Sequence, residues 1–169
     1  IAKHGPKAFY GGEVGKRLVA DMVDNDGLIT MDDLAAYEAE DVEPVWGKYR
    51  GYDIASMPPP SSGGVHVIQM LNMLEAFPLG YMGHNSAETI HIMAEVMKRA
   101  YADRSEHLGD PNFWDVPVEG LTSTEYAASL IKDLDRWTAT PSDDIKAGKP
   151  QAYESEETTQ FTVVDKQGN

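Results

Sequence analysis

A threonine between a polar stretch and a β-rich segment is the residue of this sequence with the most specific potential chemistry. Thr158 lies in Glu157-Thr158-Thr159, just before Phe161-Thr162-Val163-Val164. A threonine hydroxyl is a weak nucleophile unless a base activates it, and an N-terminal α-amine is one such base. Because Thr158 lies inside the chain, the peptide bond between Glu157 and Thr158 would first have to be cut. The residues alone leave Thr158 either as an ordinary strand residue or as a latent nucleophile.

A second candidate is a calcium loop. Asp24-Asn25-Asp26-Gly27-Leu28-Ile29 resembles half of such a loop, with glycine at the sharp turn. In that frame Met22 takes the first ligand position and Asp33 takes the twelfth, where a bidentate glutamate is usual. Because a thioether is a poor ligand for a hard cation, we expect a helix end with solvated acidic side chains instead.

Two further patterns have ordinary structural explanations. Glu88 and His91 have the spacing of a carboxylate-bridged metal motif, but the sequence has no second Glu-x-x-His. Ser61-Ser62-Gly63-Gly64 could present backbone amides to an anion at a helix start. It has no lysine after the glycines and no Gly-x-Ser-x-Gly elbow, so we interpret it as a flexible loop and helix start. We therefore expect neither a metal nor a cofactor.

The elements that would position these residues are mostly helices. Alternating charged and apolar residues predict an amphipathic helix over 13–25, and Thr30 is expected to cap a short helix with Leu34 and Tyr37 turned inward. An apolar helix is predicted over 65–77. Asn85 and Glu88 form a capping-box pattern for a long helix that ends near residue 108. Its buried stripe is expected to consist of Ile90, Met93, Ala94, Met97 and Tyr101.

The remaining segments predict two short strands, one helix, a linker and a terminal strand. Apolar residues punctuated by glycines predict a pair of strands over 42–57. Thr122 and Glu125 repeat the capping pattern before a helix that carries Tyr126, Leu130 and Leu134. Residues 138–157 are expected to form an exposed linker, and residues 158–169 one strand with a turn. Because a lone strand needs partners, we expect this chain to be part of a longer protein.

The composition excludes several classes of function. The 169 residues include 28 acidic and 14 basic side chains, a formal net charge of −14, which argues against nucleic acid and anionic membrane surfaces as partners. The absence of cysteine excludes disulfides, a thiolate zinc site and a catalytic thiol. No run approaches the roughly 20 apolar residues of a membrane span.

Taken in order, several motifs resemble the γ-glutamyltranspeptidase family along nearly the whole chain. The most specific is Met57-Pro58-Pro59-Pro60-Ser61-Ser62-Gly63-Gly64, and the processing signature is Glu157-Thr158-Thr159-Gln160-Phe161-Thr162-Val163-Val164-Asp165. The others are Ala8-Phe9-Tyr10-Gly11-Gly12, Gly27-Leu28-Ile29-Thr30, Asp33-Leu34-Ala35-Ala36-Tyr37, Tyr49-Arg50-Gly51-Tyr52, Ala100-Tyr101-Ala102-Asp103-Arg104-Ser105 and Leu108-Gly109-Asp110-Pro111.

The resemblance implies an N-terminal-nucleophile (Ntn) hydrolase. Such precursors cut themselves into a large and a small subunit that stay together as an α/β/β/α sandwich, so the fold class expected here is α+β, with one terminal core strand. The scissile bond would be Glu157–Thr158, and Thr158 would be both the nucleophile and the new N-terminus. Residues 1–157 would then be the later part of the large subunit, and residues 158–169 the first strand of the small subunit.

The resemblance further implies the activity. Thr158 would take a γ-glutamyl group from glutathione and transfer it to water, an amino acid or a peptide, in a periplasmic or secreted protein. The family often has Gln before the nucleophile and His as the third residue of the strand, where this sequence has Glu157 and Gln160. The family's substrate-clamping Arg, second Thr and oxyanion groups match no position here, so we expect these 169 residues alone to be inactive.

Two other functions stay open at this point. The first is a different reaction of the same superfamily, such as that of a glutaryl-type β-lactam side-chain acylase or a poly-γ-glutamate depolymerase. The second belongs to another class, a non-catalytic helical module that binds calcium through residues 24–33. The pocket residues of the whole protein would separate the enzymes, and calcium binding that Asp24→Ala abolishes would identify the module.

Overall fold

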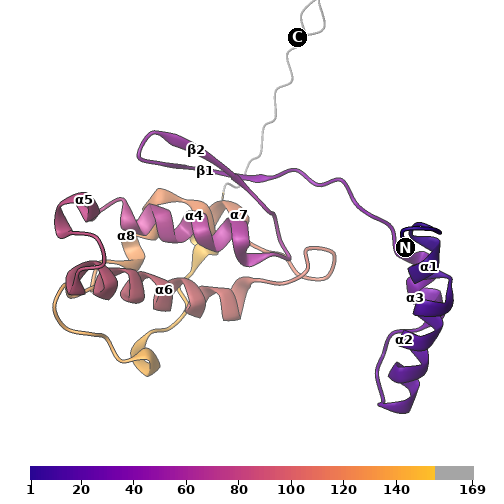
Figure 1. Ribbon diagram of the computed structural model, residues 1–169. Helices are drawn as coiled ribbons and strands as arrows, with labels where there is room; N and C mark the ends of the chain where they lie inside the picture. The colour runs from indigo at the N-terminus through magenta and orange to yellow at the C-terminus, as the bar shows by residue number, and fades with distance from the viewer. Residues whose placement is uncertain (155–169) are drawn as a thin grey trace, which may run out of the picture. The chain divides into compact units, whose positions relative to one another are not determined.

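The computed structural model describes residues 1–154, and these fall into two units (Figure 1). The first unit comprises Ile1–Val42 and the second begins at Glu43. The predicted terminal strand, 158–169, lies outside the described residues. In the described part, helices predominate and the only sheet has two strands, an α+β composition.

The first unit contains the three helices α1 (Lys7–Tyr10), α2 (Glu13–Asp24) and α3 (Met31–Ala36). The predicted helix over 13–25 is confirmed, and so is the cap of the next one. Thr30 and Asp33 form a capping box, in which the Asp33 amide donates to Thr30 Oγ1 at 3.2 Å and the Thr30 amide donates to Asp33 Oδ2 at 2.8 Å. Leu34 is buried as predicted, but Tyr37 is not. Because Tyr37 leaves the helical conformation, its ring stacks on Tyr10 and stays 66% exposed.

The acidic loop after α2 has the backbone conformation of a helix end. Asp26 has φ +55°, and the Gly27 amide donates to the carbonyl of Met22 at 2.7 Å, the pattern that ends a helix with a left-handed residue. Asp33, the twelfth position of the calcium frame, accepts from Thr30 instead. Among residues 1–154, no group of three or more His, Asp or Glu side chains is arranged to hold a metal ion.

The second unit opens with the predicted pair of strands, β1 (Val45–Tyr49) and β2 (Tyr52–Ser56), which pair antiparallel with Gly47 opposite Ile54. Arg50 at φ +49° and Gly51 at φ +83° form the two-residue turn that matches the twist of a hairpin. The inner face of the hairpin rests on α4 (Ser62–Leu74), where Gly47 allows Ile68 to approach the β1 backbone.

Helix α4 is the centre of this unit and packs against α6 (Ala87–His107), α7 (Val118–Thr122) and α8 (Thr124–Leu130) (Figure 1). The short helix α5 (Leu79–Met82) lies between α4 and α6 in the chain, and the 3-10 helices η1 (Ser142–Asp144) and η2 (Pro150–Tyr153) follow α8. None of the described helices is long and apolar enough to cross a membrane. The apolar core consists of Met73, Leu74, Ile92, Val96, Ala100 and Ala127, with a second cluster of Val65, Leu121 and Tyr126.

The long helix α6 differs from its prediction at its start and on its buried face. Its cap is Ser86, whose hydroxyl accepts from the Thr89 amide at 3.1 Å, and Asn85 instead adopts φ +52°. The predicted buried stripe is wrong, because Ile90, Met93, Ala94, Met97 and Tyr101 are all exposed in the described chain. The buried face is half polar, and it consists of Ile92, Glu95, Val96, Arg99, Ala100, Asp103 and His107.

The starts of two other helices lie one or more residues from the predicted positions. Helix α4 begins at Ser62, capped by Ser61. Helix α8 is capped by Ser123, whose hydroxyl accepts from the Tyr126 amide at 3.0 Å. Thr122, the predicted cap, belongs to α7 and donates its hydroxyl to the Val118 carbonyl at 2.8 Å. Adjacent hydroxyl residues make the position of a cap ambiguous, and the backbone conformation decides between them.

Candidate functional site

The two residues predicted to carry the chemistry, Glu157 and Thr158, lie outside the described residues. What the structure describes is the chain that leads to them. We call residues 148–154 the approach segment. Most side chains over 138–154 are exposed, as expected of a linker, yet side chains of α6 hold the backbone of this stretch at several places. At its end, the Glu154 side chain accepts from the backbone of α7.

The approach segment begins at a buried carboxylate. Asp103 of α6 is fully buried, and its Oδ1 accepts from the Gly148 amide at 2.7 Å. Its Oδ2 accepts from Gln69 Nε2 at 2.5 Å and from the Tyr126 hydroxyl at 2.8 Å. Three donors offset the cost of burying the charge. Burial, and then the neighbouring Asp103 carboxylate, raise the pKa of Tyr126, so its hydroxyl stays protonated as a donor.

A buried histidine extends this network. His66 Nδ1 lies 2.8 Å from Gln69 Oε1, and because that oxygen can only accept, Nδ1 carries the proton. The other ring nitrogen, Nε2, is buried and has no hydrogen-bond partner within residues 1–154. Burial lowers the pKa of His66, so the ring is neutral at pH 7.

A second ionic cluster on α6 holds the chain around Thr140. Arg99 donates to Glu95 Oε2 at 2.8 Å and to the Leu130 carbonyl at 2.8 Å, and the Thr140 amide donates to Glu95 Oε1 at 3.1 Å. Lys98 pairs with the same carboxylate and donates to the Thr140 carbonyl at 2.5 Å. Burial alone would raise the pKa of Glu95, but the hydrogen bonds from Lys98, Arg99 and Thr140 outweigh it and lower the pKa to about 2.

The end of the approach segment rests on α7. The Gly120 amide donates to Glu154 Oε1 at 2.6 Å, and Pro150 is fully buried against the same glycine. The ring of Tyr153 lies 5.3 Å from that of Tyr126. His107 Nε2 lies 3.1 Å from the Gly148 carbonyl, to which it donates. Side chains of α6 and backbone of α7 together fix residues 148–154.

Sequence reasoning missed these buried polar residues, although a signal was present. Glu95, Arg99, Asp103 and His107 follow one another at intervals of four residues, which places them on one face of a helix. A charged helix face is normally solvated, so the sequence favours the apolar residues of this helix for the core. The acidic and basic members at i and i+4 are the feature that could have indicated pairing.

The other sequence candidates have local structural roles. Glu88 forms an ion pair with Arg136, and His91 Nε2 donates to the Asp135 carbonyl at 2.9 Å, so both hold the turn after α8. Ser61 Oγ accepts from the Gly63 amide at 3.1 Å as a helix cap.

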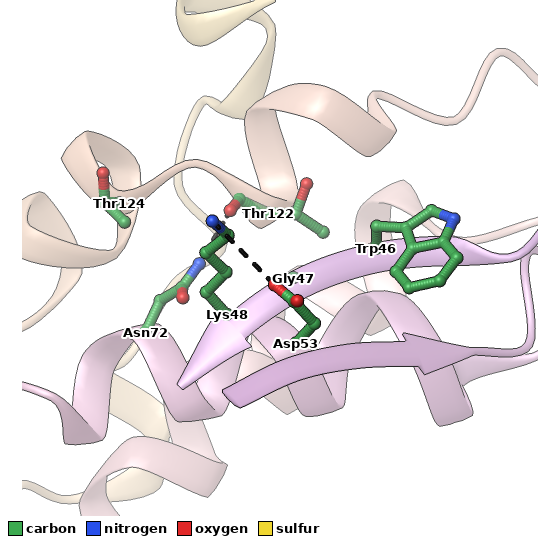
Figure 2. A pocket seen from close by; sticks show the side chains of 7 residues that line it. All are labelled: Trp46, Gly47, Lys48, Asp53, Asn72, Thr122 and Thr124. Atoms are coloured by element: carbon green, nitrogen blue, oxygen red, sulfur yellow. Dashed lines mark hydrogen bonds and ion pairs between the residues drawn. The ribbon is translucent and has the colours of Figure 1, made fainter. Parts of the chain in front are cut away.

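An open hollow of about 500 Å³ lies between the hairpin and the loop that joins α7 to α8 (Figure 2). Lys48 and Asp53 face each other across the strands at 3.9 Å, and Asn72 donates to the Thr122 carbonyl at 2.7 Å. The lining residues are Trp46, Gly47, Lys48, Asp53, Asn72, Thr122 and Thr124. The hydroxyls of Thr122 and Thr124 also have local acceptors, the Val118 carbonyl at 2.8 Å and Glu125 Oε2 at 3.1 Å. The polar groups of the hollow are thus engaged in structural contacts.

Comparison with known proteins gives a consistent result. The family model described as Gamma-glutamyltranspeptidase matches residues 1–169. The chain is 51% identical over its full length to the glutathione hydrolase proenzyme of Escherichia coli (strain K12), of which it covers 29%. It is 44% identical to the Acylase ACY 1 proenzyme of Pseudomonas sp. (strain SE83), again over its full length and over 30% of that protein.

The same relationship holds in three dimensions. The structure of Helicobacter pylori gamma-glutamyltranspeptidase superimposes with a TM-score of 0.78 and 45% identity, over 92% of this chain and 44% of that one. The chain spans less than a third of the length of the two curated relatives, the glutathione hydrolase proenzyme and the acylase proenzyme. Because the family model covers every residue and the fold agrees, this chain belongs to the γ-glutamyltranspeptidase family.

Proposed function

We propose that this chain is the part of a γ-glutamyltranspeptidase precursor in which the precursor cuts itself between Glu157 and Thr158. The observation that carries the proposal is the family match over all 169 residues, which includes the Glu157-Thr158-Thr159 junction. The names of the relatives as proenzymes support it, because a proenzyme is converted to its active form. The fixed approach segment, which ends three residues before Glu157, is compatible with a defined cleavage point.

The cleavage step needs only the chain itself and water. The Thr158 Oγ attacks the Glu157 carbonyl carbon, and the hydroxyl proton moves to the amide nitrogen as the C–N bond breaks. An ester then links Glu157 to Thr158 Oγ, and the nitrogen becomes the free α-amine of Thr158. Water hydrolyses the ester, which leaves a Glu157 carboxyl group and restores the Thr158 hydroxyl.

Turnover would use the amine that cleavage has released. The Thr158 amine takes the proton of the Thr158 hydroxyl as Oγ attacks the γ-carbonyl carbon of glutathione, and it passes a proton to the departing cysteinylglycine amine. A γ-glutamyl ester remains on Thr158. Water releases glutamate from it, or the amine of an amino acid or peptide takes the γ-glutamyl group, and the hydroxyl is restored.

The proposal assigns each part of the chain to a subunit. Residues 1–157 would belong to the large subunit and residues 158–169 would begin the small subunit, with the two subunits held together in an α/β/β/α sandwich. The fold similarity to a gamma-glutamyltranspeptidase structure supports this architecture. We propose a periplasmic or secreted location on the family relationship alone.

The test compares complete precursors that carry this chain. Intact mass spectrometry is expected to show wild type cut at Glu157–Thr158, Thr158→Ala uncut, and the neighbouring variant Thr159→Ala cut at the same bond. A chromogenic γ-glutamyl anilide is expected to be hydrolysed by wild type and not by Thr158→Ala. Cleavage of Thr158→Ala at the same bond would show that Thr158 is not the agent.

A second candidate function is an acylase acting on another acyl group. The 44% identity to an acylase proenzyme favours it, since the identity to the glutathione hydrolase proenzyme is only slightly higher at 51%. Both reactions would use Thr158 in the same way. Parallel assays of the mature protein with glutathione, a glutaryl β-lactam amide and poly-γ-glutamate separate the γ-glutamyl transfer reaction from the two alternatives of the same superfamily. The proposed γ-glutamyl transfer requires glutathione to have the highest kcat/KM.

A further inference from the structure

The last described residue of the chain makes a specific contact with the backbone of α7. Glu154 Oε1 accepts from the Gly120 amide at 2.6 Å, and Glu154 is partly buried although most residues of the preceding stretch are exposed. A carboxylate that accepts from a backbone amide is among the stronger protein hydrogen bonds. The contact therefore fixes a chain position that composition alone assigns to a linker.

The surroundings of Gly120 are shaped around this contact. A Cβ atom built on Gly120 would overlap the Pro150 carbonyl oxygen and would lie 3.0 Å from Glu154 Oε1. Glycine is thus the residue that lets both ends of η2 rest directly on α7. The buried Pro150 and the Gly148 amide on Asp103 fix the same segment from the other side.

Glu154 is close to the predicted cleavage point along the chain. Glu157 is three positions after it and Thr158 four. A fully extended chain advances about 3.3–3.6 Å per residue, so four residues can span at most about 14 Å. Fixing Glu154 therefore limits how far the reacting bond can be from this contact.

We propose that Glu154, held by the Gly120 amide, is a positioning residue for self-cleavage at Glu157–Thr158. The proposal rests on the proposed function, because it presupposes that this bond is the one that is cut. Glu154 does not touch the reacting atoms. By fixing the chain just before them, it reduces the conformations from which the Thr158 hydroxyl must find the Glu157 carbonyl, and reaction rates depend steeply on such positioning.

The proposal separates two activities that a purely structural role would change together. Before cleavage, Glu154 and Thr158 are parts of one chain, and the position of one restricts the other. After cleavage, Thr158 begins a new chain and its link to Glu154 is lost. Loss of the Glu154–Gly120 contact should therefore slow the single cleavage event and leave later turnover at Thr158 unchanged.

The experiment measures cleavage and turnover in the same complete precursors. Glu154→Ala, Glu154→Gln and the control Asp143→Asn are purified uncut at low temperature, and the first-order rate of appearance of the two subunits is followed by mass spectrometry. Asp143 lies on η1 and is exposed. Glu154→Ala is expected to be cut about tenfold or more slowly than wild type. Glu154→Gln, which keeps an acceptor oxygen, is expected to be intermediate, and Asp143→Asn to match wild type.

The cut fraction of each variant is then assayed with a γ-glutamyl anilide, per mole of new Thr158 N-terminus. Equal kcat and KM in Glu154→Ala and wild type support the proposal. Wild-type cleavage rates in Glu154→Ala would overturn it, and so would parallel losses in cleavage and in turnover, which indicate a general structural role. Gly120→Ala, which displaces the same contact from the other side, is expected to slow cleavage as well.

The outcome for Thr158→Ala keeps the two proposals apart. If Thr158→Ala is cut at Glu157–Thr158, the proposed function fails whatever Glu154 does. If Thr158→Ala stays uncut while Glu154→Ala is cut at the wild-type rate, the proposed function stands and the positioning role fails.

Discussion

The Tyr126 hydroxyl donates a 2.8 Å hydrogen bond to the fully buried carboxylate of Asp103. Asp103 lies on α6, and Tyr126 lies on α8, 23 residues further along the chain. The other oxygen of the same carboxylate binds the Gly148 amide. The buried Asp103 carboxylate thus joins α6 and α8 to the segment that leads to the predicted cleavage point. Conservative substitutions can measure how much this network contributes to the free energy of unfolding.

Tyr126→Phe is expected to destabilise the protein while keeping the ring in place. The substitution removes one of three donors to a buried carboxylate, and leaving such a group short of a partner costs about 1–3 kcal/mol. Urea unfolding of the complete protein measures the loss. Tyr81→Phe is the matched control, because Tyr81 is 96% exposed, and its effect should stay below about 0.5 kcal/mol.

Arg99→Ala should be among the most damaging substitutions on α6. Arg99 and Glu95 are only 4% and 1% exposed, so removing the guanidinium leaves the carboxylate buried with fewer donors. Breaking a buried pair in this way costs about 3–5 kcal/mol. Arg17→Ala removes an exposed pair with Glu13 and should cost at most about 1 kcal/mol. Similar losses in the two variants would contradict the buried-pair account.

The stability of the protein should fall in acid partly through Glu95. Its pKa is about 2 in the folded protein, below the ordinary value of 4.5, so the unfolded chain binds the proton more readily. The stabilisation is therefore fully present above about pH 5 and is lost as the pH falls towards 2. Thermal midpoints measured from pH 7 to pH 2.5 test this. Glu95→Gln should show a shallower decline than wild type, and identical slopes would contradict the prediction.

Gly47→Ala is expected to push the hairpin away from α4. A Cβ at Gly47 would lie 2.6 Å from Ile68 Cγ2, and overpacking of this kind typically costs about 1–3 kcal/mol. Lys48→Ala, on the opposite face of β1, should have little effect. The added Cβ would overlap the Ile68 side chain. Ile68→Ala should therefore lower the free energy of unfolding less in the Gly47→Ala background than in wild type. A double-mutant cycle with no coupling would exclude this contact as the cause.

Local features of this chain could be predicted from the sequence because their physics is local. The cap that Thr30 forms with Asp33 involves residues three apart, and the hairpin turn is marked by Gly51, which readily adopts positive φ. The ordered motifs that resemble γ-glutamyltranspeptidases are likewise a property of the sequence, and the family match confirms them. Thr158 as the nucleophile stays a prediction, since it lies outside the described residues.

The buried face of α6 was decided only by the tertiary structure. Apolar periodicity favoured Met93 and Met97, whereas Glu95, Arg99 and Asp103 are the residues that are buried. Periodicity ranks residues by their cost of desolvation, and it cannot show that Leu130, Thr140, Tyr126 and Gly148 supply partners that offset that cost. Those partners lie more than 20 residues away in the sequence. Composition predicts a linker over residues 138–157 for the same reason, whereas distant hydrogen bonds hold Thr140, Gly148 and Glu154 in place.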